Sequence, residues 1–212
     1  MGHDDFAFEP VKGLPELPPE GEYILWQGNP DWWALSREAL SLWWVVGYFV
    51  LLAFWRFGTL VDQTSVATAI VASAPLLILG AVVAALLVLT AYIQARSTVY
   101  TITNRRVAMR IGAALTVTLN LPFSKIARAD LGLRPDGTGT IAMELMGDTR
   151  MSYLVCWPHV RPWRMARTQP ALRCIPDAAS VARLLSEQAQ AHVDQPVIAR
   201  TDHRRGVTVA AE

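Results

Sequence analysis

Two long stretches without a charged residue limit what this chain can fold into. The first runs from Ala39 to Trp55 (17 residues) and the second from Gln63 to Ala95 (33 residues). An α-helix rises ~1.5 Å per residue and the hydrocarbon core of a bilayer is ~30 Å thick, so the first stretch just spans it and the second spans it with residues to spare. Because few soluble helices are apolar on every side for so long, we expect a transmembrane hairpin over residues 38–95, with helices at about 39–56 and 66–94, provided that Pro75 does not break the second.

The distribution of charge predicts how this hairpin is oriented. Residues 1–38 carry eight acidic and two basic residues, whereas residues 96–212 carry 16 basic and nine acidic residues. Arg96, Arg105, Arg106 and Arg110 follow the second apolar stretch closely, and Lys and Arg near the ends of a span favour the cytoplasmic side. We therefore expect a multi-pass protein of the bacterial inner membrane with both termini in the cytoplasm, and no cleavable signal peptide.

After Arg96 the sequence changes to the two-residue alternation of β-strands. Candidate strands cover residues 100–102, 107–111, 115–121, 126–133, 141–145 and 151–155, with residues 170–175 as a possible seventh, and the Asp-Gly pair at 136–137 is a strong turn signal. Residues 177–192 follow with one apolar stripe, which predicts a helix. The sequence thus predicts an α+β membrane protein in which a small antiparallel β-barrel or sandwich over residues 96–192 is capped by a C-terminal helix. Residues 1–37 form a separate N-terminal segment, and residues 193–212 form a flexible tail.

Tryptophans are concentrated just before the first apolar stretch. Trp26, Trp32 and Trp33 suit the membrane interface, where an indole ring has an apolar body and a polar tip. Packing of the same rings against the β-domain explains the pattern equally well.

A segment near the C-terminus combines the residue types that dominate protein-binding surfaces. In CWPHVRPWRMAR (156–167), tryptophan and arginine alternate around two prolines. Trp and Arg are enriched in binding hot spots, and proline lowers the entropy lost when a loop is ordered. We expect the partner-binding residues to be Trp157, His159, Arg161, Trp163, Arg164 and Arg167, unless the segment is a connector packed on its own barrel.

A second basic feature is the turn formed by Asn104, Arg105 and Arg106, with Arg110 close by. Basic residues at a membrane surface attract anionic headgroups by about 1 kcal/mol each. We expect Arg96, Arg105, Arg106 and Arg110, together with Trp26, Trp32 and Trp33, to face the membrane or its headgroups. A solvated hairpin that obeys the positive-inside bias is the alternative.

A search for catalytic or metal-binding patterns returns none. The four histidines, His3, His159, His192 and His203, lack metal-ligand spacing, and neither apolar stretch contains an ionisable residue that would mark a transport path. Cys156 and Cys174 are expected to be small apolar fillers in a reducing compartment. We expect no enzyme activity, no cofactor, no metal and no nucleic-acid partner.

Several short motifs resemble known membrane proteins. YxITNRRV (100–107), Gly112, LPFSKI (121–126) and GTGTI (137–141) resemble the bacterial pleckstrin-homology (PH)-like domain found after membrane hairpins. Nearly the whole chain, including LPELPPEGEYILWQGNPDWWALSREAL and VRPWRMARTQPALRCIPDAASVARLL, resembles the PuhB family of photosynthetic complex assembly proteins of purple bacteria. The resemblance implies assembly of the reaction centre in the intracytoplasmic photosynthetic membrane, self-association, and no catalytic residues.

Two functions of different classes follow from these observations. The first is a membrane-anchored, non-catalytic scaffold that binds reaction-centre subunits or their pigments at the cytoplasmic face. The second is a lipid-headgroup sensor that uses the basic turn at Arg105 and Arg106 as its site. An enzyme of pigment or lipid metabolism is a third interpretation, but the sequence offers no motif for it.

Overall fold

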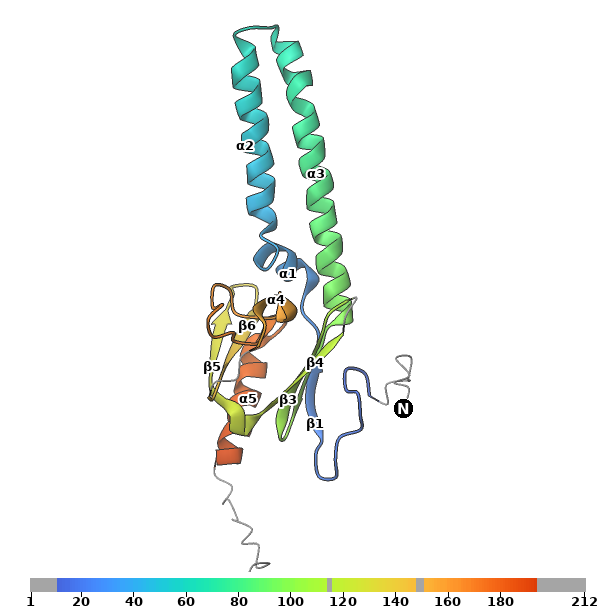
Figure 1. Cartoon of the computed structure of the whole chain (residues 1–212), viewed down its shortest axis with the longest axis vertical. Coiled ribbons are helices and arrows are strands. Elements are labelled where there is room, and N and C mark those ends of the chain that lie inside the picture. Colours follow the sequence, from blue (N-terminus) through green and yellow to red (C-terminus); the bar gives the residue numbers. More distant parts are fainter. Residues whose placement is uncertain (1–10, 114–115, 148–150, 194–212) are drawn as a thin grey trace, which may run out of the picture.

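A helical hairpin stands on one end of a β-domain (Figure 1). The structure is a computed structural model, and it describes residues 11–113, 116–147 and 151–193. The N-terminal residues 1–10 and the predicted tail from residue 194 onward lie outside the described residues. We call the end of the β-domain from which the hairpin leaves its helix-proximal end.

The hairpin consists of α2 (Leu42–Val61) and α3 (Val66–Ser97). Ser65 starts α3, because its side chain accepts a hydrogen bond from Thr68 N, and α3 continues through Pro75 without interruption. Both helices are long and apolar enough to cross a membrane, and only 6% and 11% of their most apolar windows are buried. They therefore do not form the core of a soluble domain, and their exposed apolar surfaces indicate association with a membrane.

The two helices approach each other closely at Gly80. A Cβ atom at this position would lie 2.6 Å from Phe49 Cβ, well inside van der Waals contact. Ala53, Ala69 and Ser73 are also buried along the hairpin. Small residues let the two backbones pack closely, which is the usual way in which apolar helices associate in lipid.

The first sheet has the order β1-β2-β3-β4 and is antiparallel throughout. Its strands are β1 (Ile24–Gly28), β2 (Val99–Thr103), β3 (Arg106–Ile111) and β4 (Val117–Pro122). Strand β1 was not expected. It pairs with β2, with Gly28 opposite Tyr100, although the whole helical hairpin separates the two strands in the sequence. The predicted boundary after residue 37 is therefore wrong in one respect: the N-terminal segment belongs to the β-domain.

The second sheet has the order β5-β6-β7. The short 3-10 helix η1 (Phe123–Lys125) leads from the first sheet into β5 (Ile126–Leu133), which pairs with β6 (Gly139–Leu145) and through it with β7 (Ala171–Ile175). The expected turn is present, with Gly137 at a φ of 80° and Asp136 accepting a hydrogen bond from Thr138 N. The strand expected at 151–155 is absent, because Tyr153–Cys156 forms a short helix, α4, instead.

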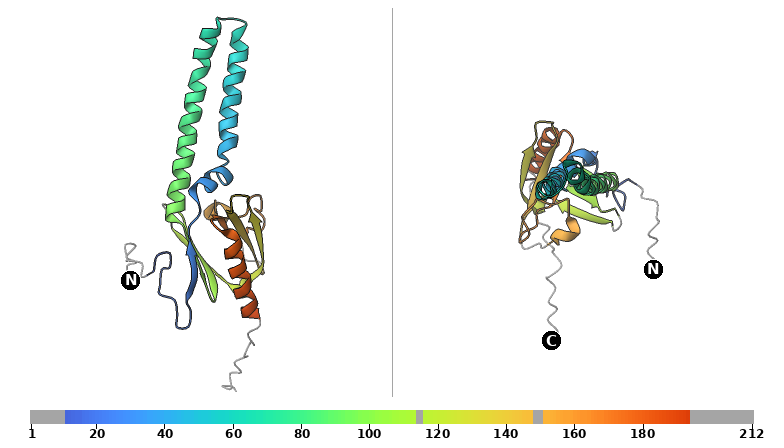
Figure 2. Two further views of the ribbon diagram at one scale, coloured as in Figure 1. Left: turned by 180° about the vertical axis from the view of Figure 1, so that it is seen from behind. Right: turned by 90° about the horizontal axis from the view of Figure 1, so that it is seen from above.

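Helix α5 (Ala178–Val193) packs against the second sheet, as seen from behind in Figure 2. Val181 and Leu185 enter a core to which both sheets contribute, with Tyr100, Met109 and Met143 fully buried. The expected C-terminal capping helix is thus present. Two apolar helices combined with antiparallel sheets and one covering helix make the mixed α+β arrangement that the sequence predicts.

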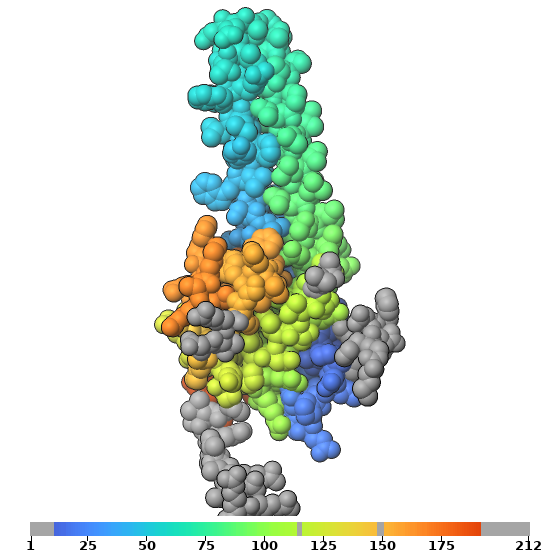
Figure 3. All heavy atoms as spheres, viewed as in Figure 1, coloured from blue at the N-terminus to red at the C-terminus, as the bar shows by residue number. Residues whose placement is uncertain are grey.

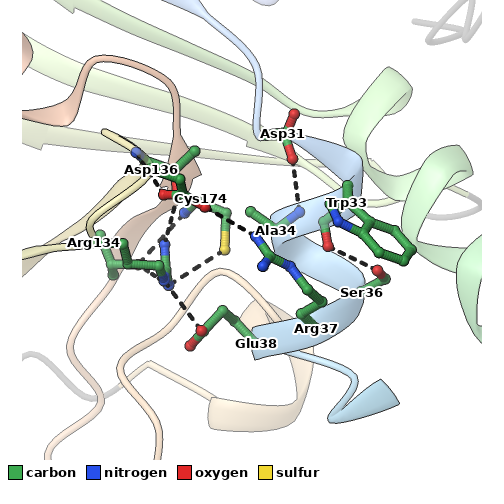
Figure 4. A network of polar contacts seen from close by, with 11 residues as sticks. Asp31, Trp33, Ala34, Ser36, Arg37, Glu38, Arg134, Asp136 and Cys174 are labelled. Carbon is green, nitrogen blue, oxygen red and sulfur yellow. Dashed lines mark hydrogen bonds and ion pairs between the residues drawn. The ribbon is translucent and has the colours of Figure 1, made fainter. Parts of the chain in front are cut away.

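A short helix, α1 (Trp32–Glu38), joins the hairpin to the β-domain (Figure 4). Its buried Ala34 and Leu35 pack with Ala91 and Ala95 of α3 and with Cys174 of β7. Asp31 caps the helix through its side chain, which accepts from Ala34 N, and its own N–H donates to Cys174 O over 2.7 Å.

Two ion pairs flank this contact. Arg37 Nη2 lies 2.9 Å from Asp136 Oδ2, and Arg134 Nε lies 3.2 Å from Glu38 Oε1. Arg134 also donates to Cys174 Sγ over 3.7 Å. Helix α1 is therefore tied to both parts of the molecule at once. We call this set of contacts the α1 joint.

The close approach at Gly80 predicts a stability difference between two glycine variants. In Gly80→Ala the new methyl group must displace Phe49, which should cost about 1–3 kcal/mol. Gly47→Ala is the matched control, since a Cβ there meets nothing within 4 Å and both changes gain the same ~1 kcal/mol of helix propensity. Thermal unfolding of the full chain in mild detergent should give a lower Tm for Gly80→Ala than for Gly47→Ala, and equal Tm values would show that the helices do not pack at this point.

Candidate functional site

The most exposed apolar side chains of the β-domain lie on α4 and the loop that follows it. Trp163 is 87% exposed and Leu154 is 84% exposed, and Val155, Trp157 and Met165 of the same segment are exposed as well. We call these five residues the 154–165 surface. Single exposed apolar residues are common on proteins, but five within twelve positions mark a candidate binding surface.

The 154–165 surface lies at the helix-proximal end of the domain. Figure 3 shows the segment in orange beside the lower end of α2, and Figure 1 places α4 next to α1. A partner that contacted this surface would therefore also lie next to the helical hairpin.

The base of the loop is buried and firmly held. Cys156, His159 and Val160 are at most 2% exposed, and Val160 forms an isolated bridge with Pro170. His159 N donates to Cys156 O and Ala171 N donates to His159 O. The loop thus leaves the core and returns to it at one point, and only its tip is exposed.

His159 is the centre of a buried polar network at this base. Its Nδ1 lies 2.6 Å from the Tyr100 hydroxyl and its Nε2 lies 3.1 Å from Thr98 Oγ1. Burial raises the pKa of Tyr100, so its phenol stays protonated and donates to Nδ1 while it accepts from Arg173 N. The Nε2–H then donates to Thr98 Oγ1, so one neutral tautomer of His159 satisfies both ring nitrogens.

This network ties the loop to the end of α3. Thr98 follows the last residue of α3, and its N–H donates to Gln94 O. Arg173 of β7 reaches across and donates from Nη1 to Pro158 O and Val160 O. Loop, hairpin and sheet are therefore joined through buried hydrogen bonds.

Arg161 connects the outgoing and returning strands of chain at the base of the loop. Its Nη1 lies 2.7 Å from Asp130 Oδ2 and also donates to Gln169 Oε1, while its backbone N–H donates to Gln169 O. The hydrogen bonds from Arg161 and Arg128 hold the pKa of Asp130 below its usual range. The side chain of Arg161 is therefore engaged in contacts that hold the two ends of the loop together.

The structure separates the six expected partner-binding residues into two groups. Trp157, Trp163, Arg164 and Arg167 are exposed on the loop, and Trp163 is held outward at a φ of 64°, which is uncommon for a bulky residue. The expectation that His159 binds a partner is wrong, because the residue is 1% exposed and its ring nitrogens hydrogen-bond to Thr98 and Tyr100 inside the domain. Arg161 is only partly exposed and has an intramolecular partner.

The structure also divides the expected headgroup-facing residues. Arg96 lies at the end of α3, and Arg110 lies opposite Val99, next to that end. Strand β2 runs away from α3, and its 5 residues extend about 16 Å at a strand rise of ~3.3 Å per residue, so the turn at Arg105 lies beyond its far end. The expectation is therefore wrong for Arg105 and Arg106, which lie at the opposite end of the domain.

Other contacts explain two of these outcomes. Arg106 is paired with Glu22, with Nε 2.8 Å from Oε1. Trp26 packs against the core of the β-domain, so it does not face the membrane. Trp32 and Trp33 remain exposed on α1, where Trp32 stacks edge-on against Tyr92 of α3.

Sequence reasoning missed Leu154, Val155 and Met165. Residues 151–155 alternate like a strand, which predicts that every second side chain is buried. The nearby prolines at 158 and 162 were the signal that the segment does not enter a sheet. Among the residues that the structure describes, no group of three or more His, Cys, Asp or Glu side chains can hold a metal ion, and Cys156 and Cys174 are buried and unpaired with each other.

The buried His159 predicts that stability depends on pH. Burial and the positive charge of Arg173 lower its pKa to about 3, whereas an unfolded histidine titrates near 6.5. Well above pH 6.5, His159 is neutral in both the folded and the unfolded chain. As the pH falls through 6.5, the unfolded chain binds a proton at this histidine and the folded chain does not, so the folded state loses stability. Between pH 6.5 and 5 the loss should reach about 1–2 kcal/mol.

Chemical unfolding of the full chain in detergent at pH 6.5 and pH 5 measures this loss. In His159→Gln the free energy of unfolding should be lower at both pH values, but the difference between them should shrink. An unchanged difference in His159→Gln would assign the pH dependence to other groups.

Comparisons with known proteins agree with the arrangement of hairpin and β-domain. The bacterial PH domain family matches residues 39–189, which include α2, α3 and most of α5. The chain is 44% identical over 214 residues to a protein of Rhodobacter capsulatus described as "Uncharacterized 23.7 kDa protein in puhA 5'region", with 100% of both chains covered. No solved structure matches the chain. On the extent of the family match and of this identity, the chain belongs to the bacterial PH domain family.

Proposed function

We propose that the protein is a membrane-anchored assembly factor for the photosynthetic reaction centre. In this proposal α2 and α3 cross the inner membrane, and the β-domain is a non-catalytic scaffold at its cytoplasmic face. The 154–165 surface binds reaction-centre subunits where they emerge from the bilayer. Such a role requires a rigid, exposed docking surface and no acid–base chemistry.

The observation that carries the proposal is the geometry of this surface. Its tryptophans are exposed, with Arg164 and Arg167 beside them, while its base is fixed to α3 through His159 and Thr98. Aromatic anchors next to arginine are typical of binding hot spots, and a fixed base lowers the entropy lost on docking. The position beside α2 fits a partner that is itself a membrane protein.

The relative from Rhodobacter capsulatus supports the choice of partner. Its description places its gene in the region 5' of puhA, which is a reaction-centre gene context. The likeness between the two chains extends over their full length, and the present chain also carries the motifs that resemble the PuhB assembly proteins.

The lipid-sensor alternative loses its expected site. It relies on the basic turn at Arg105 and Arg106, which lies at the end of the domain away from the hairpin, with Arg106 paired to Glu22. A membrane crossed by α2 and α3 does not reach this turn.

The proposed orientation predicts the outcome of a topology experiment. A reporter that is active only in the periplasm should be inactive when it is fused after residue 113, because the β-domain is expected on the cytoplasmic side. The same reporter inserted between α2 and α3, after Gln63, should be active. The reverse pattern would contradict a cytoplasmic scaffold.

The docking surface predicts the result of a capture experiment in a photosynthetic host. The tagged full chain, extracted from membranes in mild detergent, should bring reaction-centre subunits with it. Trp163→Ala combined with Met165→Ser should lower their recovery about thirtyfold, because loss of an anchoring tryptophan costs ~2 kcal/mol or more. His159 and Arg161 are left unchanged, since they hold the loop.

Tyr23→Ala is the matched control for this experiment. Tyr23 is also an exposed aromatic residue, but it precedes β1 at the opposite end of the domain, and its loss should leave recovery unchanged. Both variants should unfold at the wild-type temperature, because exposed substitutions change stability by about 0.5 kcal/mol or less. A folded Trp163/Met165 variant that recovers subunits at the wild-type level would show that the loop is only a connector.

A further inference from the structure

A hollow lies on the α3 side of the helix-proximal end. It has a volume of about 250 Å³ and is bounded by the end of α3, the start of α1 and the chain before β1. Its walls include Lys12, Asn29, Pro30, Trp32, Tyr92 and Arg96. It thus combines two cations, an amide and two aromatic rings in one place.

The hollow has a net positive charge. No carboxylate lines it, and in the part of the chain that the structure describes neither Lys12 nor Arg96 forms an ion pair. Arg96 lies over the ring of Tyr92, with Cζ 5.5 Å from the ring centroid, which fixes the guanidinium without neutralising it. The nearby carboxylate of Asp31 is engaged in capping α1. This arrangement favours an anion.

The end of a helix carries carbonyl groups that would repel an anion, but here several of them accept hydrogen bonds within the protein. Asn29 Nδ2 donates to both Ala95 O and Thr98 O. Gln94 O accepts from Ser97 Oγ and from Thr98 N. The negative end of the α3 dipole is therefore partly satisfied before any ligand binds.

The level of the hollow along the hairpin corresponds to the headgroup region. Phe49 lies against Gly80, so in this antiparallel pair Arg56 is about level with Ser73. From Ser73 to Tyr92 the axis rises about 28 Å, at ~1.5 Å for each of about 19 residues. If Arg56 marks one edge of a hydrocarbon core ~30 Å thick, Tyr92 and the hollow lie at the other edge.

The aromatic residues support this level. Trp32 lies edge-on to Tyr92, with 6.3 Å between ring centroids, and Trp33 lies 5.8 Å from Trp32. Trp and Tyr are enriched where a membrane protein passes through the interface. Trp55, beside Arg56, occupies the corresponding place at the opposite edge.

We propose that this hollow binds the phosphate group of an anionic phospholipid. Lys12 and Arg96 pair with the phosphate oxygens, and Trp32 and Tyr92 pack beside the glycerol part of the lipid. The site rests on insertion of the hairpin in a membrane, but it is separate from the 154–165 surface and requires no reaction-centre subunit.

Lipid binding to the purified full chain tests the proposal. Phosphatidylglycerol or phosphatidylcholine with identical acyl chains is titrated into the protein in neutral detergent, and bound lipid is counted by native mass spectrometry. The wild type should bind phosphatidylglycerol at least fivefold more tightly. Lys12→Gln and Arg96→Gln should each weaken its binding about fivefold, as expected for one basic residue at a membrane surface, and leave phosphatidylcholine unchanged.

Two further variants act as controls. Arg105→Gln removes the same charge from an exposed residue at the far end of β2 and should change neither affinity. Arg96→Lys keeps the charge and should retain most of the preference. If Arg96→Gln loosens the fold through its contact with Tyr92, Lys12→Gln decides the question alone, because the Lys12 side chain is exposed.

Three results would overturn the proposal. The first is equal affinity of the wild type for the two lipids, and the second is an equal loss of preference in Arg105→Gln. The third is displacement of phosphatidylglycerol by millimolar inorganic phosphate, which would assign the hollow to a soluble anion. None of these results bears on capture of reaction-centre subunits, so this proposal and the proposed function can fail independently.

Discussion

The arrangement of the whole molecule depends on the close packing of small side chains at the α1 joint. Ala34 is fully buried in one cluster with Ala91 and Ala95, and the fully buried Leu35 contributes about 1.5–3 kcal/mol. The two flanking ion pairs are partly exposed and screened by solvent, so packing rather than charge holds the joint. Since packed contacts of this kind do not deform gradually, the joint sets one orientation of the β-domain relative to the hairpin.

That orientation brings two different surfaces to the same end of the domain. The 154–165 surface lies beside α2, and the basic hollow lies at the end of α3. The buried network of His159, Tyr100 and Thr98 connects the loop to the residue that follows α3. The positions of both surfaces are therefore fixed relative to α3. In the proposed function, lipid and protein partners would be met on adjacent faces of one rigid body.

Periodicity in the sequence was sufficient for the elements whose environment is uniform. The hairpin is apolar on all sides, and the sequences of β2, β3, β5, β7 and α5 each carry the pattern of their own element type, so these types were predicted correctly. Strand β1 was missed because its partner is β2, far along the chain, and its short sequence ILWQG alternates too briefly to stand out. His159 was misassigned for a related reason: its neighbours in sequence are exposed loop residues, whereas its hydrogen-bond partners Tyr100 and Thr98 lie on another part of the chain.

The pairing of β1 with β2 imposes an order on how the chain is made. Gln27 hydrogen-bonds to Thr101, and 74 residues separate them, so β1 leaves the ribosome well before its partner exists. At ~5–20 residues per second this interval lasts about 4–15 s, and both apolar helices are synthesised within it. Closure of the first sheet around β1 therefore comes after both helices of the hairpin have been synthesised. Until β2 has been made, β1 is a strand with two open edges, and such edges can pair with another chain.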